Sequence, residues 1–246
     1  MPTFQYCSII AVVNKSTIVT DTQGIQMVAA LNQLLPKFCN DWKITRFVLT
    51  YVARGSKVIP ANSYLVYLLD TSDVAGAMAY HDITSAVPYG KVFAKTVLQN
   101  GGVMLYEPTL KKSTVAQALA HEVFELIIDP RCNLWWMNYN TGTLFAGEVS
   151  DPVQSNVVVV NLSATVKVGL SDWVLPAWQD VQNTTGPFNH LNTLKAPLTI
   201  DKYGYALTIK NSTVSTVYGA LIQPNQKEAA ALSTASRLAM ITNMPS

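Results

Sequence analysis

The residues best placed to do chemistry lie in one short segment, which reads HEVFE from His121 to Glu125. Successive residues of an α-helix are about 100° apart, so His121 and Glu125 lie within about 40° of each other on one face. An imidazole nitrogen and a carboxylate at this spacing can bind one metal ion. Glu122 lies to the side of that face, where a carboxylate can take the proton from a metal-bound water. The segment therefore predicts a metal site that activates water.

A catalytic metal site also needs a third protein ligand and one open position. The best candidate is Glu148, in the sequence AGEVSDP, because an element that crosses back beside the helix would bring its carboxylate to the metal. Asp151 follows closely, and we expect its carboxylate to orient His121 through the other ring nitrogen. We expect Asp129, at the end of the helix, to cap the helix or to support the ligands from behind, and not to bind the metal.

This arrangement resembles the gluzincin type of zincin-like metallopeptidase, in which a His-Glu-x-x-(His/Glu) helix precedes a glutamate ligand and a nearby aspartate. The resemblance implies a zinc ion as cofactor, a peptide or protein as substrate, and Glu122 as the general base. It also implies that the metal ligands are His121, Glu125 and Glu148, and that the supporting carboxylate is that of Asp151.

The chain is more closely similar to uncharacterised zincin-like proteins of bacteria and tailed phages, over residues 4–210. The segments that carry this likeness are 121–130, 148–152, 171–177, 80–82 and 89–93. In the zincin fold, the strand before the active helix forms the edge of the sheet and pairs with extended substrate. The resemblance gives this role to residues 90–98. We therefore expect substrate contacts from Lys91, Val92 and Phe93. The upstream His81 could be a structural histidine or could contact the substrate or the metal.

Glu125 stands where the His-Glu-x-x-His pattern has its second histidine. One histidine and two glutamates neutralise both charges of a zinc ion, so a bound water should be less acidic than in a site with two histidines. Carboxylate ligands also favour calcium or manganese as alternatives to zinc. Without any metal, the same residues could form a buried polar network or a solvated helix face. The apolar residues around them favour a buried site, where ionisable groups need partners.

The hydrophobic pattern predicts an α+β fold: a mixed β-sheet with a long helix over the HEVFE segment, then a β-rich second half and a C-terminal helix. The resemblance implies that the sheet and its active-site helix are zincin-like. We expect one subdomain over residues 1–130 and a second over 131–246. The active helix should span 113–129, with Ser113 or Thr114 as its N-cap and Pro130 after its end.

Strands are expected over 4–13, 44–53, 63–70 and 90–98 in the first subdomain, and around 134–139, 143–149, 156–168 and 203–210 in the second. A first helix should begin near Thr20 and be limited or kinked by Pro36. Residues 171–199 are expected to form a long ordered loop, and residues 227–241 a terminal helix. Tyr203 or Tyr205, in the last of these strands, could polarise a peptide carbonyl.

Composition excludes several classes of partner. The 246 residues are 49% apolar and only 13% charged, with a net charge of +2, whereas soluble proteins average about 25% charged residues. The 17 basic residues are scattered, so we expect no nucleic acid partner. No apolar run approaches the roughly 18 residues of a membrane span. The N-terminus lacks a basic region, which predicts no signal peptide and synthesis in the cytoplasm, with the three cysteines as free thiols.

Two functions follow from these observations. The first is a metal-dependent peptidase, which a phage particle could carry. The alternative is a structural or assembly protein of the phage virion that keeps a zincin-like scaffold with weak or no catalysis. The low charge and the Thr-, Asn- and Val-rich strands favour this alternative, which would contact other virion proteins or copies of itself in an oligomer.

Overall fold

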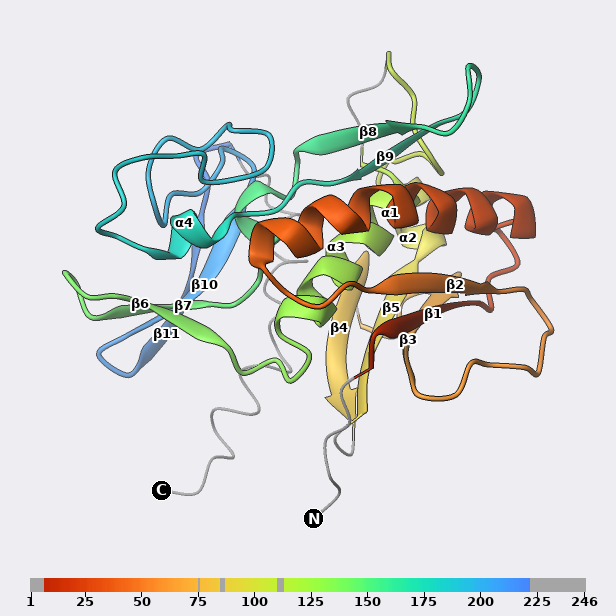
Figure 1. Cartoon of the computed structure of the whole chain (residues 1–246), viewed down its shortest axis with the longest axis horizontal. Coiled ribbons are helices and arrows are strands. Elements are labelled where there is room, and N and C mark those ends of the chain that lie inside the picture. The colour runs from red at the N-terminus through yellow and green to blue at the C-terminus, as the bar shows by residue number, and fades with distance from the viewer. Residues whose placement is uncertain (1–6, 75, 85–86, 110–112, 222–246) are drawn as a thin grey trace.

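The structure, a computed structural model of the chain, describes residues 7–74, 76–84, 87–109 and 113–221. A five-stranded sheet with the helices α1, α2 and α3 makes up the first half, and the second half is rich in strands (Figure 1). The predicted α+β class is confirmed. The expected terminal helix over 227–241 lies outside the described residues, as do the first residues of the expected strand 4–13.

The strands of the first sheet are arranged in the order β2-β1-β3-β5-β4. The first four of these are parallel, and β4 runs antiparallel to β5. Buried β-branched residues dominate β1, as is typical of an inner strand with both faces covered. The bounds are β1 (Ile9–Asn14), β2 (Val48–Val52), β3 (Ser63–Leu69), β4 (Ala79–Thr84) and β5 (Val87–Phe93).

Strand β4 forms the edge of this sheet beside the active helix. The expectation that residues 90–98 form that edge is therefore wrong. β5 lies between β3 and β4, and the chain from Ala94 to Gln99 forms the short helix α2. Val92 and Phe93 are fully buried, so these side chains are unavailable to a substrate. The apolar end of β5 is typical of an inner strand. In β4 the polar residues His81 and Asp82 interrupt the apolar pattern, and this concealed the strand.

Helix α1 (Asp21–Trp42) lies across the sheet. Thr20 is its N-cap: the Thr20 hydroxyl accepts the Gln23 backbone N–H, and the Gln23 side chain accepts the N–H of Thr20. The helix continues through Pro36, so the expected limit there is wrong. Phe38 is fully buried just beyond the proline, and its packing stabilises a turn that lacks one backbone hydrogen bond.

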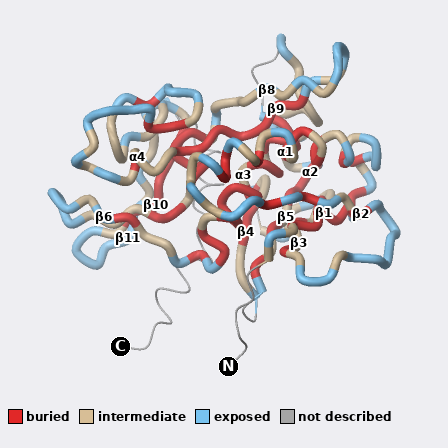
Figure 2. Tube along the Cα trace, viewed as in Figure 1, coloured by how far each residue is buried: buried red, intermediate tan, exposed pale blue. Residues whose placement is uncertain are grey.

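Helix α3 (Val115–Ile128) is the predicted active helix, and Thr114 is its N-cap. The Thr114 hydroxyl accepts the backbone N–H of Gln117 at 2.7 Å and donates to the carbonyl of Gly169 at 2.8 Å. Apolar side chains along the whole helix are fully buried, and the helix lies in the interior of the molecule (Figure 2). Its histidine and glutamate side chains are therefore held among other protein groups.

Thr114→Val should lower the free energy of unfolding by about 2 kcal/mol. The substitution keeps the shape of the side chain but removes an N-cap, worth about 1 kcal/mol, and leaves the buried carbonyl of Gly169 without its partner. Urea unfolding measures the loss. Thr213→Val, at an exposed position of a strand, is the matched control. Equal effects of the two substitutions would contradict the role of Thr114.

The second half contains a four-stranded antiparallel sheet in the order β11-β10-β7-β6 and the separate hairpin β8-β9. The single strand expected over 156–168 is therefore wrong, since residues 157–171 form this hairpin. No helix in the described part of the chain has both the length and the hydropathy that a membrane span requires. The bounds are β6 (Trp135–Asn138), β7 (Thr143–Ala146), β8 (Val157–Asn161), β9 (Lys167–Ser171), α4 (Pro176–Gln179), β10 (Tyr205–Lys210) and β11 (Thr213–Tyr218).

Asp172 anchors the loop that follows β9. One oxygen of its buried carboxylate accepts the backbone N–H groups of Trp173 and Leu191, and the other accepts the side-chain amides of Asn156 and Asn189. Burial raises the pKa of Asp172 to about 6, because it disfavours the charged carboxylate more than these hydrogen bonds favour it. In this structure, the segment 171–177 thus serves as a structural anchor.

The raised pKa of Asp172 predicts a loss of stability as the pH rises. Between pH 4 and pH 6 the folded protein holds this proton more tightly than the unfolded chain, so the free energy of unfolding falls across that interval. The fall attributable to Asp172 is roughly 3 kcal/mol. Asp172→Asn cannot titrate and should lack this part of the pH dependence. Urea unfolding of both proteins at pH 4 and pH 7.5 measures it, and parallel pH profiles would contradict the assignment.

Candidate metal centre

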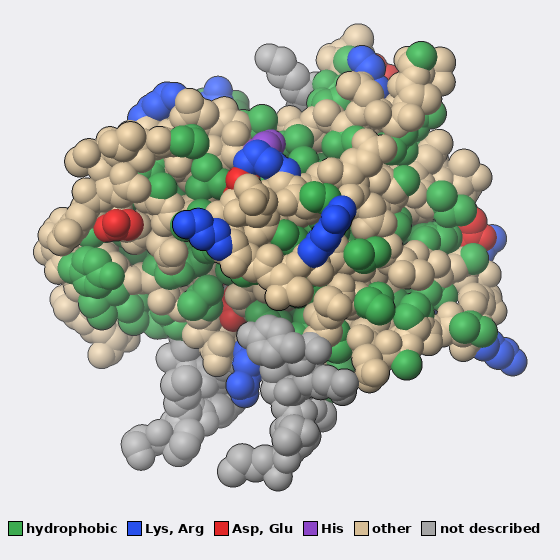
Figure 3. Space-filling view, viewed as in Figure 1, with side chains coloured by type: hydrophobic (Ala, Val, Ile, Leu, Met, Phe, Trp, Pro, Cys, Tyr) green, Lys and Arg blue, Asp and Glu red, His purple; other side chains and the backbone are tan. Residues whose placement is uncertain are grey.

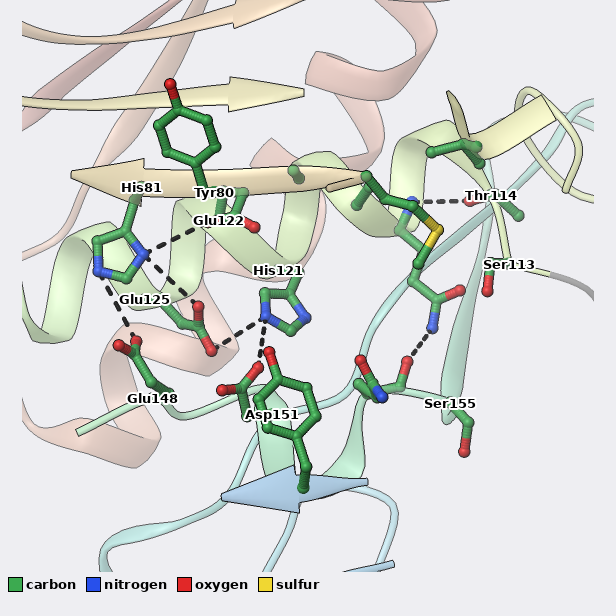
Figure 4. A pocket seen from close by; sticks show the side chains of 17 residues that line it. Tyr80, His81, Ser113, Thr114, His121, Glu122, Glu125, Glu148, Asp151 and Ser155 are labelled. Atoms are coloured by element: carbon green, nitrogen blue, oxygen red, sulfur yellow. Dashed lines mark hydrogen bonds and ion pairs between the residues drawn. The ribbon is translucent and has the colours of Figure 1, made fainter. Parts of the chain in front are cut away.

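A cavity opens between β4, α3 and the segment that follows β7. It contains most of the ionisable side chains singled out from the sequence, which turn toward one another from different elements (Figure 4). The side chains of the cluster at its centre are His81 from β4, His121, Glu122 and Glu125 from α3, and Glu148 and Asp151 from the segment after β7.

His121, Glu125 and Asp151 form the tightest group in the cluster. The Nε2 atom of His121 lies 3.1 Å from Oε1 of Glu125 and 3.1 Å from Oδ1 of Asp151. One helical turn places the first two side chains side by side, as the sequence predicted. Asp151 begins the short 3₁₀ helix η1 (Asp151–Val153), which faces that turn. The ligand atoms of these three residues all lie within 4.8 Å of one another.

Asp151 takes the place that the sequence suggested for Glu148. It faces Nε2 of His121, the same nitrogen that Glu125 faces, and not the other ring nitrogen as expected. Its Oδ1 is buried and pairs with Nε2 of His121. Its carboxylate interacts with the Tyr205 hydroxyl. Asp151 is therefore positioned as a ligand.

Glu148 lies on the other side of Glu125, next to His81. The Nε2 atom of His81 is 3.7 Å from Oε2 of Glu148, and Nδ1 of His81 is 3.6 Å from Oε2 of Glu125. These three side chains form a second group whose ligand atoms lie within 4.8 Å of one another. Neither group joins Glu148 to His121. His81, for which a structural role, a substrate contact or a metal contact was open, lies within the carboxylate cluster.

Glu122, the predicted general base, lies at the boundary of the two groups. Its side chain is only 6% exposed, and Oε2 is 3.4 Å from Nδ1 of His81. Because Glu122 directly follows His121 in α3, its side chain lies beside the cluster and not between His121 and Asp151. The sequence motif predicted Glu122 beside the metal held by His121, whereas its hydrogen-bonding contact is with His81 of the second group.

The pKa values in the cluster are shifted because several carboxylates are buried close together. Burial raises the pKa of Glu125 to about 8, and the charges of Asp151 and Glu148 add to this effect against the opposing influence of His121. Burial also raises the pKa of Asp151. Burial alone would lower the pKa values of His81 and His121, but the charged groups around each ring outweigh it and hold both well above the ordinary value.

Two other predicted residues lie away from the cluster. Asp129 is the C-cap of α3, and its carboxylate accepts the backbone N–H groups of Asn133 and Leu134, so it holds the turn after the helix. Lys91 forms an ion pair with Asp73 and lies over the ring of Tyr80. Neither side chain is among those that line the cavity.

Gly204 supports the position of Asp151 from behind. A Cβ atom at Gly204 would lie 2.2 Å from the carbonyl oxygen of Pro152 and 3.0 Å from that of Asp151. Gly204→Ala must therefore displace η1 and draw Asp151 away from His121. We expect metal affinity to fall at least about tenfold, as when a ligand loses its support.

Isothermal titration with zinc measures this change in affinity. Gly55→Ala is the control: it strains a turn with a positive φ, but a Cβ there meets nothing within 4 Å. Unchanged affinity in a folded Gly204→Ala protein would contradict the supporting role.

Comparison with models of protein families, with curated proteins and with solved structures found no match for this chain. On the face drawn in Figure 3, Lys and Arg side chains are scattered and form no continuous basic patch.

Proposed function

We propose that the chain is a metal-dependent peptidase of the zincin-like type. The observation that carries this proposal is the convergence of His121, Glu125 and Asp151 at one buried point, with Glu122 beside them and the edge strand β4 along the cavity. The order of a strand, a helix, further strands and then the helix α3 supports the zincin-like assignment.

The chemistry of the donor atoms fits a divalent metal ion. One imidazole nitrogen and two carboxylate oxygens are a ligand set that zinc accepts, and that manganese also suits. Oε1 of Glu125 and Oδ1 of Asp151 both lie 3.1 Å from Nε2 of His121, and the ligand atoms of the three residues lie within 4.8 Å of one another. A bound ion would polarise the peptide carbonyl and make a bound water more acidic.

Glu122 would accept the proton of the attacking water and pass it to the leaving amine. Its carboxylate is buried, lies on the next position of the same helix turn, and projects into the same cavity as His121. The Tyr205 hydroxyl, which also lines the cavity, holds Asp151 in place. Tyr205 therefore serves as a positioning residue in this proposal.

Strand β4 would bind the substrate in an extended form. Among the described residues it pairs only with β5. On its other edge the Cys132 thiol contacts the His81 carbonyl and the Asp82 carboxylate accepts the Ile83 N–H, so a bound peptide would replace these contacts with strand pairing. Residues 78–81 line the cavity, which places this edge next to the cluster. An extended peptide on this edge would bring a carbonyl group toward His121 and Glu122.

The test is hydrolysis of a fluorogenic peptide mixture and of an unfolded protein by the purified full chain. The chain is stripped with a chelator and then reloaded with zinc, manganese or calcium. The proposal predicts cleavage that disappears on stripping and returns with one of these metals. A loaded protein that binds metal but cleaves neither substrate would sink the peptidase assignment and favour the virion scaffold.

A further inference from the structure

We propose that the cluster holds two divalent metal ions, with the Glu125 carboxylate as the bridge between them. The first ion would be bound by His121, Glu125 and Asp151, and the second by His81, Glu125 and Glu148. The inference rests on the metal-binding part of the proposed function, and it adds a second ion that neither the sequence motif nor its resemblance predicts.

The first argument is the orientation of Glu125. Its Oε1 atom lies 3.1 Å from Nε2 of His121, and its Oε2 atom lies 3.6 Å from Nδ1 of His81. The two oxygens of one carboxylate thus face two different histidines on opposite sides. A carboxylate that presents one oxygen to each of two groups has the shape of a bridging ligand. Metal ions in two-metal enzymes lie about 3.5–4 Å apart, a separation that such a bridge spans.

The second argument is the spacing around His81. Its Nε2 atom lies 3.7 Å from Oε2 of Glu148, and its Nδ1 atom lies 3.6 Å from Oε2 of Glu125, both longer than ordinary hydrogen bonds of 2.7–3.2 Å. Ligand atoms about 2.0–2.2 Å from a tetrahedral ion lie about 3.3–3.6 Å from one another. The two nitrogens of one ring cannot bind the same ion, and the separation of Nε2 and Glu148 is the one close to this ligand spacing and too long for a direct hydrogen bond.

The third argument is an unpartnered nitrogen. The His81 side chain is only 5% exposed, and its Nε2 atom is buried without a hydrogen-bond partner among the described residues. Figure 4 shows this ring directed into the cluster, toward Glu125 and Glu148. A buried polar atom normally has a partner. An ion bound between the ring and these carboxylates would provide one.

The fourth argument is charge. Four carboxylates converge here, on Glu122, Glu125, Glu148 and Asp151, and none of their side chains is more than 12% exposed. Buried charges are stable only when they are paired or bind metals. One divalent ion balances half of the charge of four ionised carboxylates if both histidines are neutral ligands, and the other half requires either bound protons or a second ion. Two divalent ions balance all four carboxylates.

The experiment is a titration of the chelator-stripped full chain with manganese, followed by calorimetry and by elemental analysis after gel filtration. We expect two equivalents per chain in the wild type, and an electron paramagnetic resonance spectrum of exchange-coupled manganese at saturation. His81→Gln and Glu148→Gln should each retain one equivalent and lose the coupled spectrum. Two variants are used so that the test still works if one of them fails to fold. His190→Gln, which alters a ring stacked on Trp173, is the matched control.

Each outcome separates this inference from the proposed function. One equivalent in the wild type, unchanged in His81→Gln and Glu148→Gln, overturns the two-ion centre and leaves the peptidase proposal standing. Two equivalents without peptide cleavage support the centre and contradict the peptidase. Failure to bind any metal overturns both. Retention of two coupled ions in His81→Gln would also overturn the assignment of the second site.

Discussion

Glu122→Gln should lower kcat/KM for peptide cleavage at least about 100-fold while the protein still binds its metal. General acid–base catalysis contributes roughly 10²–10⁴-fold to enzymatic rates, and an amide cannot accept the proton of the attacking water. Glutamine keeps the size of the side chain, and Glu122 is not a member of either ligand group. The loss should therefore fall on the rate and not on metal content.

Glu107→Gln is the matched control for this prediction, because among the described residues Glu107 bonds only with Thr109, and it does not line the cavity. Steady-state assays and elemental analysis of both variants give the comparison. If Glu122→Gln retains normal cleavage, Glu122 is not the base. If it loses metal as well as activity, Glu122 is a ligand and its assigned role changes.

Metal affinity should rise steeply between pH 6 and pH 8, by about tenfold per pH unit for each proton displaced. In the metal-free protein, burial raises the pKa of Glu125 to about 8, and neighbouring carboxylates hold that of His121 above its ordinary value. Both groups therefore carry protons near pH 6 and must release them to bind an ion. Competition with a chelating dye across this range measures the slope, and a flat profile would contradict the ligand assignment.

The stability of the metal-free protein should change with pH in the opposite sense. The folded-state pKa of Glu125 is above its unfolded value, so the folded protein binds more protons between about pH 4.5 and pH 8 and loses stability as the pH rises. The pKa of His121 is also raised, and its stabilising contribution is lost as the pH rises through the folded-state value. Thermal unfolding at pH 5 and pH 8 should show this decline with chelator and much less of it with zinc.

The sequence predicted the parts of the site that depend on local geometry. The spacing from His121 to Glu125 fixes their relation on any helix, and the apolar run around them predicts a buried helix. Thr114 and Pro130 marked its two ends, because capping and proline chemistry act within a few residues. These features need no knowledge of the rest of the chain.

The sequence could not predict which distant side chains meet this helix. Glu148 and Asp151 are three residues apart, and only the path of the chain into η1 decides which of them faces His121. His81 lies in β4, where the polar residues interrupt the alternation of apolar and polar side chains that would identify a strand. Its position follows from the pairing of β4 with β5, a contact between segments that a single sequence does not reveal.

The cluster is assembled from both halves of the chain, since α3 supplies two side chains of the first group and the segment after β7 supplies the third. The two halves already share one apolar core, in which Phe38 and Phe124 pack against Trp173. A cation bound by side chains of both halves would add coordination bonds to this contact, so separating the halves would cost more free energy in the loaded protein than in the stripped one.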